Sequence, residues 1–411
     1  MSGKLNMTSA AIHSEEALQH VDLKRDVTKH LKRGHRWIFA NCFDEARTGK
    51  SGIRLLKFKG EPLALGIWQA DTQLRFRVLL LTEEPIFRRN NIERTLELYF
   101  DSQWRKALEI RKTFDLSITN SFRLINGEGD GLPGLIVDIY NDTAVIKHDH
   151  PIMEKVWNAK AIAEKIQAAY PHIKCVYLKR RNDESEKGVN IVGTLAPEVQ
   201  FLENGVLFAS NIRDAAKTGF FLDQRDNRKI IQHFSSGKTV LNLFSYTGGF
   251  SLFAAKGGAK EVTSVDIAKV AIEAVERNFK INNLPTTHHD VAADAFDYLE
   301  KQILEKKRYD LVITDPPSFA PNEKSVEQAK AAYTKVFSNS IKLVNSEGLF
   351  AASSCSSHIS SQEFMEICQE SFSRARKRAT LVYFGAQPVD HPYPLAMEEL
   401  RYLKFALFRL D

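Results

Sequence analysis

The sequence predicts an α/β protein of three domains, in which the last domain is a doubly wound, mostly parallel sheet. From about residue 211 to the end, short apolar runs with strand character alternate with helical stretches, which is the βαβα order of such a sheet. Before that, residues 21–91 consist mainly of short strands separated by turn-rich stretches. The length of 411 residues fits roughly two to three domains.

The composition is that of a globular protein without a membrane span. Hydrophobic residues make up 43% and charged residues 26% of the chain, which argues against a disordered, collagen-like or coiled-coil protein. The longest uncharged stretch, 239–255, contains several polar residues, and the N-terminus lacks the apolar region of a secretory signal. The four cysteines include no C-x-x-C pair, so we predict neither a disulfide scaffold nor a metal site. A cytoplasmic protein is expected.

The first domain is predicted at 18–92 and is rich in β-strands. Residues 1–17 have the character of a loose tail. Strands are expected at 52–58, 63–68 and 76–81. From Ile92 to Phe114, apolar residues recur at helical spacing, which predicts an amphipathic helix leading out of this domain.

The second domain is predicted at 93–205 as a small α+β unit. Its segment GEGDGLPG, at 127–134, is too rich in glycine to be anything but a turn. A helix is expected at about 153–169. The strands are expected at 121–125, 135–140, 143–149 and 175–180, followed by a hairpin at 199–210.

The third domain is predicted at 206–411. Its last two strands are joined by a loop without a crossover helix, so an antiparallel pair should close the otherwise parallel sheet. The strands are expected at 239–244, 261–266, 309–315, 348–354, 380–384 and 402–410.

Positive charge is concentrated near the N-terminus. The first 90 residues hold 16 Lys and Arg against 10 Asp and Glu, which accounts for the whole net charge of +6. A basic patch of this kind attracts polyanions such as nucleic acid, although a solvated helix face is an equally good interpretation. Its cations are Lys24, Arg25, Lys29, Lys32, Arg33 and Arg36.

Two strand ends in the third domain indicate a nucleoside site. The segment NLFSYTGGFSLFAA has Gly248 and Gly249 between a strand and a helix, but Phe250 and Phe253 occupy the other glycine positions of a dinucleotide-binding loop. An acid 18 residues after Gly248, Asp266, can accept hydrogen bonds from a ribose diol, although taken alone it is an equally good N-cap for the next helix. Ribose recognition without a phosphate cradle points to S-adenosylmethionine.

Two further strand ends carry reactive groups. In YDLVITDPPSFA, two prolines stop the strand and hold Asp315 at its edge. In FAASSCSSHIS, Cys355 follows a strand, precedes a helix and has serine neighbours, which suits a nucleophile better than a core residue. A helix N-terminus would lower the pKa of this thiol. Cys175 and Cys368 have the sequence surroundings of core residues.

The motifs TGFFLDQRDNR (218–228), NLFSYTGGFSLFAA, DPPSFA and SSCS, with the late DHP and RYLKF segments, resemble the bacterial ribosomal RNA large-subunit methyltransferase I family. EGDGLPGLIVDIY (128–140) matches the central domain of that family and RGHRWIF (33–39) its PUA domain. The resemblance covers roughly residues 20–411. It implies a PUA RNA-binding domain, a central α+β domain and a Rossmann-like class I methyltransferase domain that makes 5-methylcytosine in ribosomal RNA.

The resemblance also implies roles for individual residues. Asp266 would hold the ribose hydroxyls, Asp294 would face the adenine, and Phe221 and Gln224 would close the pocket. The methionine side would be lined by Phe244, Ser245, Tyr246, Thr247, Gly248 and Gly249.

Asp315 would touch both the cofactor and the target base, and Cys355 would be the nucleophile. A Cys355 thiolate that adds to C6 of cytosine makes C5 enamine-like and able to take the methyl group, while Asp315 supports the charge at N3. The base would have to leave its stack. A second branch of RNA cytosine-5 methyltransferases has another Cys in the Asp-x-Pro-Cys motif, where this chain has Ser318.

Three other functions are compatible with these motifs. A ribosomal guanine methyltransferase shares the F-x-Y-T-G and D-P-P-x-F patterns, but it needs no thiol and usually has an aromatic directly after Pro-Pro. A non-catalytic RNA-binding or assembly factor would use only the basic domain and bind no cofactor. A small-molecule methyltransferase would leave the basic domain unexplained. The sequence allows a homodimer, but no motif specifies one.

Overall fold

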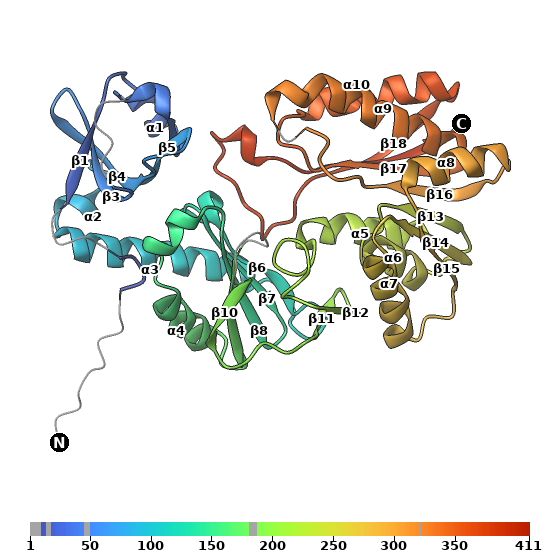
Figure 1. The fold of residues 1–411 in the computed structure, drawn as a ribbon, viewed down its shortest axis with the longest axis horizontal. Helices are drawn as coiled ribbons and strands as arrows, with labels where there is room; N and C mark the ends of the chain where they lie inside the picture. Colours follow the sequence, from blue (N-terminus) through green and yellow to red (C-terminus); the bar gives the residue numbers. More distant parts are fainter. Residues whose placement is uncertain (1–9, 14–17, 45–49, 181–186, 321) are drawn as a thin grey trace.

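The computed structural model describes residues 10–13, 18–44, 50–180, 187–320 and 322–411. The chain forms a β-rich N-terminal unit, a central α+β unit and a larger C-terminal α/β unit, arranged in this order along the molecule (Figure 1). This arrangement confirms the predicted fold class. No helix in the described part of the chain is both long and apolar enough to cross a bilayer.

The N-terminal unit is a five-stranded sheet in the order β1-β3-β4-β5-β2. All three predicted strands are present in it, and apolar residues such as Leu56, Ala64 and Phe76 form its core. The strands are β1 (Gln19–Leu23), β2 (Trp37–Phe39), β3 (Gly52–Phe58), β4 (Glu61–Trp68) and β5 (Leu74–Leu81), and the short helices are α1 (Thr28–Lys32) and α2 (Pro85–Arg88).

Helix α3 (Ile92–Arg111) connects the first two units, as predicted, and ends three residues before the expected limit. The side chain of Asn91 caps its first turn by accepting from the Arg94 N–H at 2.9 Å. Its apolar face, with Phe100 and Trp104, packs into the core of the central unit.

The central unit is a five-stranded sheet in the order β10-β9-β8-β7-β6, and four of these strands were predicted. Its elements are β6 (Ser121–Asn126), β7 (Leu135–Tyr140), β8 (Thr143–His148), α4 (Ala159–Ala169), β9 (Cys175–Lys179) and β10 (Gly188–Val192). The GEGDGLPG turn contains a 3-10 turn at Gly127–Asp130, followed by Gly131 in the left-handed region at φ 73°.

Two predictions for this region are wrong. The expected helix at 153–169 is instead a 3-10 turn at Pro151–Lys155 followed by α4, because the side chain of Asn158 accepts from two N–H groups and starts a new helix. The tail is not loose at Ala11 and Ile12, which are buried in the central core, and Ile12 forms a bridge with Trp157. Residues 1–9 and 14–17 of that predicted tail lie outside the described ranges.

The hairpin β11 (Val199–Glu203) and β12 (Val206–Ser210) forms a separate two-stranded sheet between the second and third units. The Leu202 carbonyl accepts from Asn120 in the central unit, and the Asn278 side chain accepts from Ala209 in the C-terminal unit. The hairpin therefore joins both units. The domain limits at 18–92, 93–205 and 206–411 remain our proposal, with the last limit at the turn of this hairpin.

The C-terminal unit is a seven-stranded sheet in the order β15-β14-β13-β16-β17-β19-β18. The first five strands are parallel, and β19 pairs antiparallel with both β17 and β18, as predicted. Its strands are β13 (Thr239–Leu243), β14 (Glu261–Asp266), β15 (Thr287–Ala292), β16 (Tyr309–Thr314), β17 (Val344–Ser354), β18 (Ala379–Gly385) and β19 (Lys404–Leu410).

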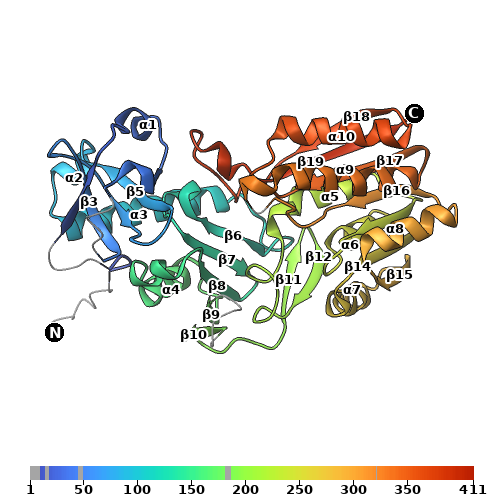
Figure 2. The same cartoon turned by 45° about the horizontal axis from the view of Figure 1, so that its top comes forward.

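Helices cover both faces of this sheet (Figure 2). One face packs against α5 (Arg225–His233), α6 (Gly249–Lys256) and α7 (Lys269–Asn282). The other packs against α8 (Ala295–Leu304), α9 (Val326–Lys342) and α10 (Ser361–Ala375). The carboxyl ends of the parallel strands therefore meet at one edge, where ligands of such sheets bind.

The segment between β18 and β19, residues 386–403, returns to the other two units (Figure 1). Asn126 of the central unit donates to the carbonyl of Pro392 at 2.8 Å, and His35 of the N-terminal unit contacts the Glu399 carboxylate at 3.0 Å. The approach at Pro392 is so close that a Cβ on Gly129 would lie 1.8 Å from its carbonyl oxygen. This connection positions the residues that enter β19.

Candidate active site

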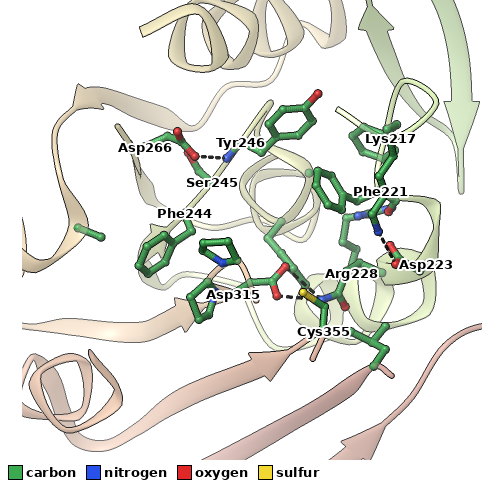
Figure 3. A pocket seen from close by; sticks show the side chains of 18 of the residues that line it. Lys217, Phe221, Asp223, Arg228, Phe244, Ser245, Tyr246, Asp266, Asp315 and Cys355 are labelled. Carbon is green, nitrogen blue, oxygen red and sulfur yellow. Dashed lines mark hydrogen bonds and ion pairs between the residues drawn. The ribbon is translucent and has the colours of Figure 1, made fainter. Parts of the chain in front are cut away.

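A cavity of about 270 Å³ opens at the carboxyl edge of the C-terminal sheet (Figure 3). Side chains reach it from the segment before α5, from the ends of β13 to β17 and from the residue before β19. Among the predicted site residues, those that line it are Phe221, Gln224, Phe244, Ser245, Tyr246, Gly249, Asp266, Asp294, Asp315 and Cys355. The structure thus brings together residues that are up to 134 positions apart in the sequence (221 to 355).

The loop after β13 has an unusual backbone. Phe244 at φ 59° and Tyr246 at φ 48° adopt the left-handed conformation, as does Gly248 at φ 86°. A Cβ on Gly248 would also lie 2.8 Å from Val275, so this position requires glycine. Gly248 and Thr247 support the loop without lining the cavity, and the Thr247 carbonyl accepts from Asn278.

Asp266, at the end of β14, is held by two backbone hydrogen bonds. Its Oδ2 accepts from the Tyr246 N–H at 2.8 Å and its Oδ1 from the Ala268 N–H at 2.9 Å. Asp294 lines the cavity and also caps α8, since its Oδ1 accepts from the N–H groups of Phe296 and Asp297. Both carboxylates are therefore fixed in place before a ligand binds.

The cavity fits S-adenosylmethionine. Asp266, the predicted ribose acceptor, lies at one side in Figure 3, and Phe244 and Tyr246 line the same cavity. Among the described residues, no group bonds to the buried hydroxyl of Ser245, which leaves a polar atom for a ligand. A cavity with a few polar groups among apolar side chains is typical of a cofactor site.

Asp315, at the end of β16, is held by Gln224. The Gln224 side-chain N–H₂ lies 3.1 Å from both carboxylate oxygens of Asp315 and 2.9 Å from the Ser353 hydroxyl. Asn227 in turn donates to the Gln224 carbonyl oxygen at 2.7 Å. Burial raises the pKa of Asp315 to about 6, and the nearby Asp223 charge adds to this effect. Gln224 thus orients a carboxyl group that can exchange a proton near neutral pH.

We expect Asp315→Asn to make the protein more stable although it removes activity. A carboxyl whose folded pKa is about 6 instead of 3.8 binds more protons in the folded state between these pH values, so stability falls as pH rises through this range. The uncharged variant should be more stable by roughly 3 kcal/mol well above pH 6, with no gain below the usual pKa. Thermal unfolding from pH 3.5 to 8 measures this. The exposed Asp297→Asn is the control, and an equal gain at both ends of the range would contradict the explanation.

Cys355 follows β17 and lines the cavity with Asp315. The predicted lowering of its pKa by a helix N-terminus is wrong. Helix α10 begins only at Ser361, with Ser360 as its cap, and burial followed by the Asp315 charge raises the pKa of the thiol to about 11. Without a ligand, the protein therefore holds Cys355 as a thiol at neutral pH. Cys175 and Cys368 are buried core residues, as predicted.

Several residues that line the cavity were not predicted from the sequence, including Lys217, Asp223, Arg228 and Leu403. The Lys217 ammonium lies 2.6 Å from an oxygen of Asp223, and the same oxygen accepts from Tyr402 at 2.7 Å. The signal was present, because Asp223 and Arg228 lie within TGFFLDQRDNR and Leu403 within RYLKF.

The predicted RNA-binding residues lie around α1. Lys24, Arg25, Lys29 and Arg33 are exposed. Lys32 is also exposed and pairs with Glu83 at 2.9 Å. Arg36 is only partly exposed and donates to the Leu79 carbonyl. Four of the six cations thus present free side-chain surface on one short segment.

Comparison with known proteins agrees with this geometry. The family model of S-adenosylmethionine-dependent methyltransferases matches residues 160–374, and the model of PUA-like domains matches residues 21–80. A methyltransferase solved in complex with SAH has the same fold, with a TM-score of 0.81 and 26% identity over 95% of this chain and 100% of that one. The cofactor of the C-terminal domain is therefore S-adenosylmethionine.

Two curated relatives extend over nearly the whole chain. The ribosomal RNA large subunit methyltransferase of Deinococcus radiodurans is 33% identical over 93% of this chain and 95% of its own length. The ribosomal RNA large subunit methyltransferase I of Shewanella frigidimarina is 31% identical over 95% and 99%. On this similarity, the chain belongs to the ribosomal RNA large subunit methyltransferase I family.

Proposed function

We propose that this enzyme methylates C5 of a cytosine in large-subunit ribosomal RNA through a covalent adduct with Cys355. The names of the two relatives support ribosomal RNA as the substrate. The observation that carries the choice of base is the shared cavity of Cys355 and Asp315, which sets a thiol beside a carboxyl group with a pKa of about 6. Cytosine C5 needs such a nucleophile, because it is too electron-poor to take a methyl group unaided.

In the proposed reaction, the Cys355 sulfur forms a bond to C6 of the flipped cytosine. The thiol proton passes to water, the electrons of the C5–C6 double bond move through C4 toward N3, and protonated Asp315 delivers a proton to N3. S-Adenosylmethionine supplies the methyl group that C5 then takes. The C5 proton is then lost to solvent, β-elimination breaks the C6–S bond and releases Cys355 as a thiolate, and N3 returns its proton to Asp315. Proton uptake from water restores the thiol.

The surroundings of the Asp-Pro-Pro motif weigh against guanine as the target. An aromatic ring that stacks on a guanine would have to face the cavity after Pro317. Phe319 instead packs on Phe296 and Tyr333, at ring-centroid distances of 6.4 and 4.8 Å, and does not line the cavity.

The product identifies the reaction. We would incubate the enzyme with S-adenosylmethionine and unmodified large-subunit ribosomal RNA, as naked RNA and as particles, and determine the methylated nucleoside by mass spectrometry. The proposal predicts 5-methylcytidine. A methylguanosine would overturn the choice of base, and the absence of any product from both substrates would overturn ribosomal RNA methylation.

The basic N-terminal patch is proposed to bind the RNA backbone. Exchanging exposed Lys29 and Arg33 for Glu should weaken RNA binding at least about tenfold and reduce the slope of log affinity against log salt by about one for each lost phosphate contact. Filter binding at several salt concentrations measures both quantities. The control reverses Lys269 and Lys280, which are exposed on α7. Unchanged affinity and slope in the Lys29/Arg33 variant would exclude the patch.

A further inference from the structure

Lys404 lies directly behind the loop that carries Cys355. It is the first residue of β19, and the antiparallel register pairs it with Ser354, the last residue of β17. Cys355 directly follows Ser354 in the chain, so it lies one residue beyond the partner of Lys404. A long side chain at the start of β19 can reach the backbone of the loop that follows β17.

The Lys404 ammonium binds three carbonyl oxygens of this region. It donates to Ile359 at 2.6 Å, to Tyr402 at 2.8 Å and to Ser356. The residue is only 1% exposed, so these bonds replace its hydration. Three acceptors require three N–H groups, which only the charged form of lysine has. Lys404 thus fixes both ends of the loop 356–359 and stays an ammonium in the folded protein.

This buried charge has no carboxylate partner within the part of the chain that the structure describes. Burial lowers the pKa of Lys404 to about 8, and the main opposing influence is the charge of Cys355, followed by that of Glu363, which is itself paired with Lys330 at 2.9 Å. A buried cation without a counter-ion is costly, and an anion formed nearby offsets that cost.

The other charged groups around Cys355 do not supply this positive charge. Asp315 and Asp223 both raise the pKa of the thiol, and Tyr402 and Tyr333 are neutral phenols beside it. Lys217 lowers the pKa of the thiol more than Lys404 does, but Asp223, its ion-pair partner at 2.6 Å, raises that pKa and offsets the effect of Lys217. Among the described cations near Cys355, Lys404 is therefore the one whose charge is available to stabilise a Cys355 thiolate.

We propose that Lys404 is a positioning residue that holds the loop of Cys355 by its three carbonyl bonds and provides the counter-charge for the Cys355 thiolate. This inference rests on the proposed role of Cys355 as the nucleophile. In the resting enzyme the ammonium binds backbone carbonyls, and when Cys355 loses its proton for attack on C6, the same ammonium stabilises the negative sulfur.

The test is the reactivity of the Cys355 thiol in Lys404→Met, which removes the charge and the three donors. Iodoacetamide alkylates only the thiolate, and mass spectrometry of the Cys355 peptide separates it from the other three cysteines. We expect the alkylation rate at pH 7, where Lys404 carries its charge, to fall about tenfold, equivalent to a rise of one unit in the thiol pKa. kcat should fall while the KM for S-adenosylmethionine stays the same. Arg409→Met, on the exposed side of the same strand, is the matched control.

A second variant separates charge from folding. Lys404→Gln keeps two donor hydrogens for the loop but no charge, and S-adenosylhomocysteine binding reports whether either variant retains its site. A folded variant with the wild-type pH profile of alkylation would overturn the counter-charge role. The alkylation assay uses neither RNA nor methyl transfer. A failure of the proposed cytosine-5 reaction would therefore be seen in the analysis of the methylated nucleoside, and a failure of the Lys404 proposal in the alkylation rates.

Discussion

Cys355→Ala is expected to abolish methyl transfer, with kcat at least about 10⁴-fold lower, because Cys355 is the only thiol among the described residues that line the cavity. Cys355→Ser should be nearly as inactive, since a serine hydroxyl is a much weaker nucleophile than a thiolate. Both variants should keep their affinity for S-adenosylhomocysteine. Transfer of a labelled methyl group to ribosomal RNA measures the loss. Cys42→Ala, which removes a partly exposed thiol in the N-terminal unit, is the control.

A trapped adduct tests the same residue in the wild-type enzyme. RNA with 5-fluorocytidine at the target has no C5 proton to lose, so β-elimination cannot occur and the enzyme should remain attached to the RNA. We expect this complex to survive denaturing electrophoresis with wild-type protein and to be absent with Cys355→Ala. Full activity of Cys355→Ala would instead reduce Cys355 to a bystander and leave a mechanism without a thiol.

The sequence predicted six strands of the seven-stranded C-terminal sheet well, because these are mainly apolar runs bounded by turn residues, a pattern that the largely polar β15 lacks. β13 and β16, for example, are found within one residue of their expected limits. Errors arose where one contact decides the outcome. The side chain of Asn158 starts a new helix inside an otherwise helical pattern, and Ala11 and Ile12 are ordered by distant core residues rather than by local preference.

The candidate site was predictable in position and less so in chemistry. Residues that follow parallel strands meet at one edge of the sheet, so the strand ends alone are enough to group Asp266, Asp315 and Cys355. The bond from Gln224 to Asp315 joins residues 91 positions apart and has no local signal. The raised pKa of Cys355 depends on burial and on the charge of Asp315, and neither influence can be read from the residues next to Cys355 in the sequence. Lys404 has the sequence appearance of an ordinary strand residue.

Asp390→Ala is expected to be the most destabilising of these changes, because Asp390 connects two units through a buried charge. Its carboxylate is 0% exposed and accepts from both terminal nitrogens of Arg225, at 2.6 and 2.9 Å. It also accepts from the backbone N–H of Arg123 in the central unit at 2.9 Å. Removing one partner of a buried ion pair costs about 3–5 kcal/mol, since the other charge is left without compensation.

The loss should appear as a fall in Tm of roughly 10 °C and as faster proteolysis within 386–403. His391 and Arg225 hold the pKa of Asp390 well below its usual value of 3.8, against the effect of burial. Because the pKa of Asp390 is lower in the folded protein than in the unfolded chain, its carboxylate stabilises the fold at every pH above 3.8. The loss of stability in Asp390→Ala should therefore persist through neutral pH and become smaller only in acid below 3.8. Thermal unfolding at a series of pH values tests this sign.

Asp226→Ala separates burial from charge, since Asp226 faces the same Arg225 at 3.7 Å with a side chain that is 52% exposed. This variant should lose less than about 1 kcal/mol, because water screens the pair. Equal effects of the two variants would contradict the burial argument. Asp390 lies in the segment that leads to Tyr402 and Lys404, so its loss should also slow alkylation of Cys355. If Asp390→Ala lowers Tm but leaves the reactivity of Cys355 unchanged, the pairing of β19 with its neighbouring strands is enough to position Lys404.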